Sequence, residues 1–132
     1  MEGNPDGLRS LAKYSKLPVE RIRYHVTADE GTVRSIDRGV LFLMAFWSVP
    51  SVRAFAKLTE VLAALPSDAL ELVVVDVDGS AALDELPELK GQITAGAGQT
   101  AWVRNGRIVA TSGLGMNVEC FKPNTLALLS MA

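Results

Sequence analysis

The chain has 132 residues, of which 48% are hydrophobic, and a formal net charge of -2 at pH 7. These values are typical of one soluble domain with its own core, and they give no electrostatic reason to expect nucleic acid or an anionic membrane as a partner. One cysteine and one histidine exclude an intramolecular disulfide and a His-rich metal site, so no metal or other cofactor is expected.

Residues 1–20 are predicted to form an N-terminal extension, and residues 21–132 to form the main domain. Leu8 and Leu11 stand at helical spacing within the extension, and Pro18 ends any helix there. No basic leader followed by an apolar segment opens the chain, and the longest apolar run is shorter than the roughly 20 residues that span a bilayer. We therefore expect a cytoplasmic protein.

The next part of the chain shows two strands, each followed by a helix. Alternating polar and β-favouring residues predict a short strand over residues 21–26. Residues 27–30 have capping-box spacing, with Thr27 as the cap, so a short helix to about Asp37 should follow. The unbroken apolar run over residues 39–46 predicts a strand buried on both faces. Apolar residues at helical spacing then predict an amphipathic helix over about residues 51–65.

The second half begins with another buried strand, predicted over residues 70–77 because of its run of valines. Residues 80–90 favour a helix that Pro87 interrupts, and the glycine-rich residues 93–99 favour an irregular loop.

A hairpin and a helix are predicted to close the domain. Asn105-Gly106 lies between two β-favouring segments and is a strong signal for a tight hairpin, because both residues tolerate positive φ. Pro123 favours the start of a closing helix. The resulting order, β-α-β-α-β-α-β-β-α, predicts parallel strands joined by helical crossovers, with the hairpin adding antiparallel strands.

This pattern resembles the thioredoxin-like proteins over about residues 22–131. The central strand ends at Ala45-Phe46-Trp47, and Ser48-Val49-Pro50-Ser51 follows where that family has Cys-x-x-Cys. In a second register, shifted by three residues, Ser51 and Ala54 take the two cysteine positions. Gly98-Gln99-Thr100 stands where the family has a cis-proline. The resemblance implies a three-layer α/β/α fold with a central mixed sheet and a C-terminal β-hairpin plus helix.

Neither register contains a thiol, so thiol-disulfide exchange is not expected. We expect a redox-inactive thioredoxin-like domain that acts as a protein-binding or assembly module, and an enzyme is the less favoured expectation. Ser48 and Ser51 are expected to cap the helix. The predicted partner is a protein, and the edge strand at residues 107–111 would permit a homodimer. The expected contact residues are Trp47, Ser48, Val49, Pro50, Ser51, Gly98 and Gln99.

Two alternatives use other residues. The segment Asp76-Val77-Asp78-Gly79-Ser80 after an apolar strand resembles the nucleophile loop of haloacid-dehalogenase-like phosphohydrolases. The resemblance implies a Mg²⁺-dependent phosphohydrolase using Asp76 and Asp78, although the late acidic motif of that family is missing. The other alternative is a one-cysteine peroxidase or glutathione-dependent activity through Cys120.

Overall fold

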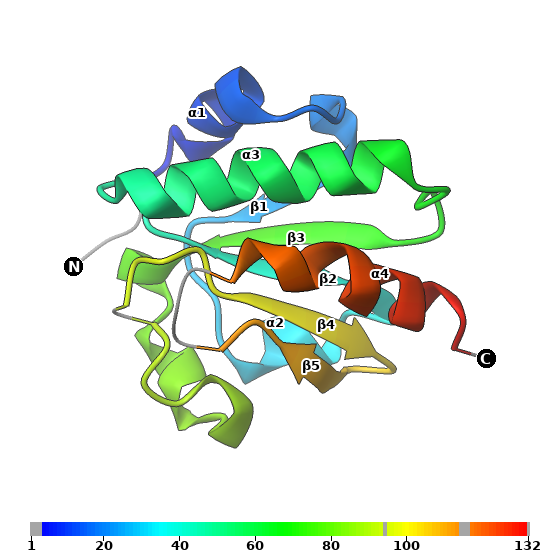
Figure 1. The fold of residues 1–132 in the computed structure, drawn as a ribbon. Helices are drawn as coiled ribbons and strands as arrows, with labels where there is room; N and C mark the ends of the chain where they lie inside the picture. The colour runs from blue at the N-terminus through cyan, green and yellow to red at the C-terminus, as the bar shows by residue number, and fades with distance from the viewer. Residues whose placement is uncertain (1–3, 94, 114–116, 132) are drawn as a thin grey trace.

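The structure is a computed structural model and describes residues 4–93, 95–113 and 117–131. In this part of the chain, five strands form one mixed sheet in the order β1-β3-β2-β4-β5, with helices on both faces (Figure 1). The strands are β1 Ile22–His25, β2 Arg38–Met44, β3 Glu71–Asp76, β4 Thr100–Arg104 and β5 Arg107–Thr111. The α-helices are α1 Gly7–Tyr14, α2 Glu30–Arg34, α3 Val49–Ala64 and α4 Phe121–Leu129.

The sheet is parallel on one side and antiparallel on the other, as the sequence predicts. Strand β3 pairs in parallel with both β1 and β2, whereas β4 pairs antiparallel with β2 and with β5. The predicted hairpin between β4 and β5 is confirmed, because Asn105 has φ 54° and Gly106 has φ 72°. Strand β5 lies at the edge of the sheet.

The central strand β2 is buried on both faces, which confirms the prediction from its apolar run. Val40 and Phe42 belong to the core cluster on one face, and Leu41 and Leu43 belong to the cluster on the other. Helices α1, α3 and α4 supply side chains to the first cluster, and α2 with the 3-10 turns supplies the second. Burying each large apolar side chain contributes about 1.5–3 kcal/mol, so this double-sided strand anchors the fold.

Helix α2 begins later than the sequence predicts. Its N-cap is Asp29, whose side chain accepts a hydrogen bond from the Thr32 N–H at 3.3 Å. The Thr32 hydroxyl accepts one from the Asp29 N–H at 3.2 Å and completes the capping box. The cap predicted at Thr27 is therefore wrong by two residues. The free N–H of Thr32 is bound by the carboxylate of Asp29 instead.

The segment after β3 is not a continuous helix. It forms separate 3-10 turns at Val77–Gly79, Ala81–Glu85 and Pro87–Leu89. Pro87 has no N–H and disfavours helical backbone at the residue before it, and Leu86 is extended with ψ 127°. Further on, α4 begins at Phe121, so Pro123 lies within its first turn.

The segment before β1 contributes to the core. Leu11 of α1 is fully buried and Leu17 is buried in the cluster that α3 also supplies. Residues 1–3 of the expected N-terminal extension lie outside the described residues. Among the helices of the described ranges, none has the length and apolar character that crossing a bilayer requires.

Candidate functional site

The site lies where β2 ends and α3 begins. Trp47 is 60% exposed, and its indole Nε1 donates a hydrogen bond to Asp78 Oδ1 at 3.3 Å. The six-membered ring of the indole lies over Gly96, where an added Cβ would come within 2.7 Å of the ring. The backbone of Gly96 has φ +66°. Loops that follow β2 and β3, together with the loop before β4, therefore hold one exposed aromatic ring in place.

The two serines do not cap α3 with their side chains. Ser48 is the N-cap residue by position, but its hydroxyl donates to the Gly96 carbonyl. Ser51 is fully buried, and its hydroxyl accepts a hydrogen bond from the Ala45 N–H at 3.0 Å. The expected side-chain capping is wrong, because both hydroxyls join α3 to neighbouring segments instead. Val49 and Pro50, between the serines, are exposed.

Gly98 and Gln99 lie behind this surface and not on it. Gln99 is 1% exposed, its Oε1 accepts a hydrogen bond from the Ala97 N–H at 3.3 Å, and its peptide bond is trans. Gly98 has φ +78°, and a Cβ there would overlap Ala54 of α3. The structure thus brings all the expected contact residues to one end of the sheet, but it buries Ser51, Gly98 and Gln99. Their binding role stays a prediction, and the accessible part centres on Trp47 and Val49.

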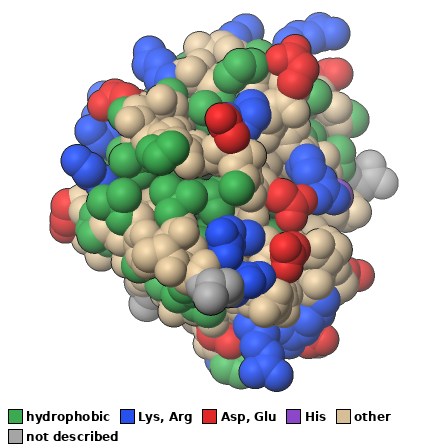
Figure 2. Space-filling model, turned by 90° about the vertical axis from the view of Figure 1, so that its right-hand side faces the viewer, with side chains coloured by type: hydrophobic (Ala, Val, Ile, Leu, Met, Phe, Trp, Pro, Cys, Tyr) green, Lys and Arg blue, Asp and Glu red, His purple; other side chains and the backbone are tan. Residues whose placement is uncertain are grey.

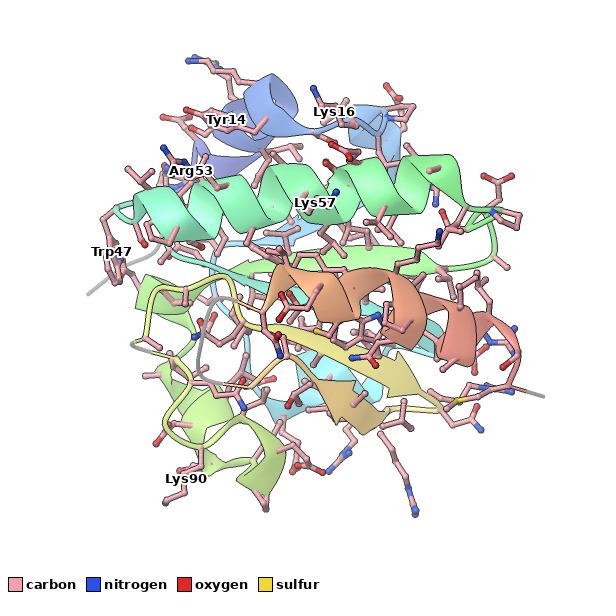
Figure 3. The ribbon with its side chains drawn as sticks, viewed as in Figure 1. Tyr14, Lys16, Trp47, Arg53, Lys57 and Lys90 are labelled. Carbon is pink, nitrogen blue, oxygen red and sulfur yellow. The ribbon has the colours of Figure 1, made fainter. Side chains whose placement is uncertain are left out.

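A groove between α1 and the start of α3 extends this surface, and we call it the α1–α3 groove. It is lined by Tyr14, Phe46, Trp47, Ser48, Val49, Val52, Arg53 and Ala56. Tyr14 lies at α1 and Arg53 at the side of α3 nearest α1 (Figure 3), and both line the groove. Sequence reasoning missed both residues. The only available signal was the position of Tyr14, three residues after the buried Leu11.

Asp76 is a structural carboxylate. It is 1% exposed and accepts hydrogen bonds from the N–H groups of Asn4 at 2.6 Å and Asp78 at 2.9 Å. The Tyr24 hydroxyl lies 3.4 Å from the same group. Burial, and then the neighbouring Asp76, raise the pKa of Tyr24 well above its ordinary value, so the phenol stays neutral. Within the described ranges, no group of three or more metal-binding side chains comes together.

Cys120 is the single thiol of the chain. It ends the 3-10 turn Val118–Cys120, stands at the N-cap position of α4, and is half-buried beside α3. Burial raises the pKa of the Cys120 thiol, and the negative charge of Glu119 raises it further, while a backbone hydrogen bond acts in the opposite direction. The thiol is therefore partly accessible and mostly protonated at neutral pH.

Comparison with known proteins identifies the fold. No family model matches the chain, and no curated protein gives a significant match. A solved structure matches over 80% of this chain and 94% of the matched chain, with a TM-score of 0.62 and 18% sequence identity. The matched structure is described for yeast mitochondrial 1-Cys peroxiredoxin. The description concerns the structural basis of its thiol-resolving mechanism via glutathione and thioredoxin systems. The fold is thioredoxin-like.

This match overturns the functional expectation from the sequence. The prediction of a redox-inactive protein-binding or assembly module took the missing Cys-x-x-Cys as evidence against redox chemistry. That step is wrong, because a structure with this fold is described for a 1-Cys peroxiredoxin, so a missing Cys-x-x-Cys does not exclude redox chemistry on this fold. The alternative of a Mg²⁺-dependent phosphohydrolase is wrong as well. The fold is thioredoxin-like, and the Asp76 carboxylate already accepts hydrogen bonds from two backbone N–H groups.

Proposed function

We propose that the protein is a one-cysteine thiol peroxidase on a thioredoxin-like fold that lacks Cys-x-x-Cys. Cys120 is the reacting thiol. The observation that carries the proposal is that this single cysteine lies half-buried at the start of α4 and is not sealed in the core. The fold match to a structure described for a 1-Cys peroxiredoxin supports the same chemistry. A reducing cytoplasm, which we propose as its compartment, supplies the external thiol.

The cycle needs a hydroperoxide as oxidant and glutathione as reductant. The Cys120 thiolate attacks one peroxide oxygen, an S–O bond forms, the O–O bond breaks, and the alkoxide leaves and takes up a proton. A glutathione thiolate then attacks the sulfenic sulfur, a mixed disulfide forms as the S–O bond breaks, and the hydroxide that leaves takes up a proton to give water. A second glutathione thiolate attacks the glutathione sulfur of that disulfide, which returns the Cys120 thiol and releases glutathione disulfide.

The test is consumption of hydrogen peroxide by the protein in the presence of glutathione. We expect the wild type to consume peroxide above the uncatalysed rate, and Cys120→Ser to show only that uncatalysed rate. Serine differs from cysteine by one atom, and circular dichroism of both proteins checks that the fold is retained. Equal consumption by the two proteins would show that Cys120 does not carry the reaction.

The raised pKa makes the reactivity of Cys120 dependent on pH. Only the deprotonated thiolate reacts with a labelling reagent, so the labelling rate of Cys120 should rise as the pH increases toward the pKa of its thiol. Glu119→Gln removes the adjacent negative charge, so the pKa should fall and labelling by a bimane reagent at pH 7.5 should accelerate, by about two- to fivefold. Glu88→Gln makes the same change in the Pro87–Leu89 turn on the other face of the sheet. A labelling rate that rises equally in both variants would rule out the local effect of Glu119.

A further inference from the structure

The α1–α3 groove has an apolar floor and an aromatic rim. Trp47 is 60% exposed, Val49 62% and Tyr14 44%, which makes them the most exposed large hydrophobic residues around it. The groove holds about 460 Å³, which suits the side chains of a bound segment. Since the hydrogen bonds and packing of the Trp47 loop hold the ring in place, binding would cost little ordering of that side chain.

A cation, Arg53, lines the groove, although the chain as a whole carries a net charge of -2. Residues 7–16 and 46–59, which border it, contain no aspartate or glutamate, while Asp6 and Glu60 adjoin these ranges and Asp78 accepts the Trp47 indole hydrogen bond at the rim. Arg53 is the one charged lining residue, and among the described residues it forms no ion pair. Lys16 lies further along the first segment (Figure 3), whereas Lys57 pairs with Glu60 and lines a separate depression between α3 and α4. The N-terminus of the 16-residue helix α3 adds partial positive charge beside Trp47. The cations of the two segments are Arg9, Lys13, Lys16, Arg53 and Lys57.

A second apolar depression shows what is specific about this groove. It lies between α3 and α4, where Val61 and Leu65 are bordered by Glu60 and Lys122. Figure 2 faces the ends of these helices and shows apolar side chains with both positive and negative groups around them. Because both signs of charge border this depression, it would not favour an acidic segment over a basic one. The α1–α3 groove differs, because its only charged lining residue is a cation.

We propose that the α1–α3 groove docks a segment of a partner protein that carries large apolar side chains flanked by aspartate or glutamate. An apolar side chain of the segment would pack against Trp47 and Tyr14, and a carboxylate would pair with Arg53, whose guanidinium can bind it with two hydrogen bonds. This inference does not rest on the proposed peroxidase function, because none of the lining residues is Cys120.

The test uses short synthetic peptides and tryptophan fluorescence. One peptide alternates leucine with aspartate, and the other has lysine in place of every aspartate. Trp102 is fully buried whereas Trp47 is exposed, so a change in emission on titration reports mainly on the groove. We expect the aspartate peptide to bind and the lysine peptide not to bind. Arg53→Glu should weaken binding by about tenfold or more.

Lys90→Glu is the matched control, because it makes the same change of charge at an exposed lysine away from the groove (Figure 3). It should leave the affinity for the aspartate peptide unchanged. Failure of the aspartate peptide to bind, equal binding of both peptides, or equal loss in the two variants would overturn the proposal. So would sedimentation showing a dimer that Trp47→Ala dissociates, because the groove would then hold a second copy of the chain.

Discussion

Gly98→Ala should destabilise the protein by about 4 kcal/mol. Two costs combine. The backbone of Gly98 is in the left-handed region with φ +78°, which disfavours alanine. The new Cβ would also overlap Ala54 on the buried face of α3, and this face is packed against the core, so it cannot move away freely. Urea unfolding followed by circular dichroism measures the loss.

Gly91→Ala is the matched control for this change. Gly91 has φ +81°, but an added Cβ there would meet nothing within 4 Å. It should therefore show only the backbone cost, about 1–2 kcal/mol. The double variant Gly98→Ala, Ala54→Gly should recover part of the loss, because it removes the atom that overlaps. Equal destabilisation in Gly98→Ala and Gly91→Ala would mean that the loop before β4 is not packed against α3 as described.

Asp76→Ala should cost about 3 kcal/mol of unfolding free energy. The backbone N–H groups of Asn4 and Asp78 would lose their acceptor at a position that is almost completely buried. The same loss should also loosen the connection between the N-terminal segment and the end of β3. Chemical denaturation gives the size of the effect, and increased amide hydrogen exchange around Asn4 would locate it.

Asp78→Ala is the comparison that separates this structural role from the rejected phosphohydrolase role. Asp78 accepts the Trp47 indole hydrogen bond at 3.3 Å and is partly exposed, so its loss should cost less than about 1 kcal/mol. A phosphohydrolase would instead lose activity in both variants. Equal stability of the Asp76→Ala protein and the wild type would contradict the role of Asp76 as an internal hydrogen-bond acceptor.

The sequence was sufficient to predict an element where a short stretch of residues alone determines its structure. The apolar run of β2 can only be buried on both sides, and Asn105-Gly106 has few conformations other than a tight hairpin turn. The start of α2 was missed because Thr27 and Asp29 both suit a cap, and the fold selects the second. The interruption expected at Pro87 is present, but the residues before it form 3-10 turns where an α-helix was expected.

The candidate site was harder to predict, because it depends on contacts between distant segments. The sequence placed Trp47 and Gln99 near each other, but it could not show that Gln99 is buried and Trp47 is exposed. Tyr14 and Arg53 line one groove only because α1 packs beside α3, and Tyr14 belongs to a segment that was expected to be an extension. The functional error had a different cause. The absence of the two cysteines of Cys-x-x-Cys was taken as the absence of all redox chemistry, although a peroxidase reaction can use a single thiol.

The most direct measurement of the central claim is the mass of the protein after one equivalent of hydrogen peroxide is added in the presence of glutathione. If Cys120 is the peroxidatic thiol, the spectrum should show a glutathione adduct that digestion places on the Cys120 peptide, and excess glutathione should remove it. The adduct should form faster at pH 8.5 than at pH 7, because more of the thiol is then ionised. An unmodified Cys120 under these conditions at both pH values would contradict the account.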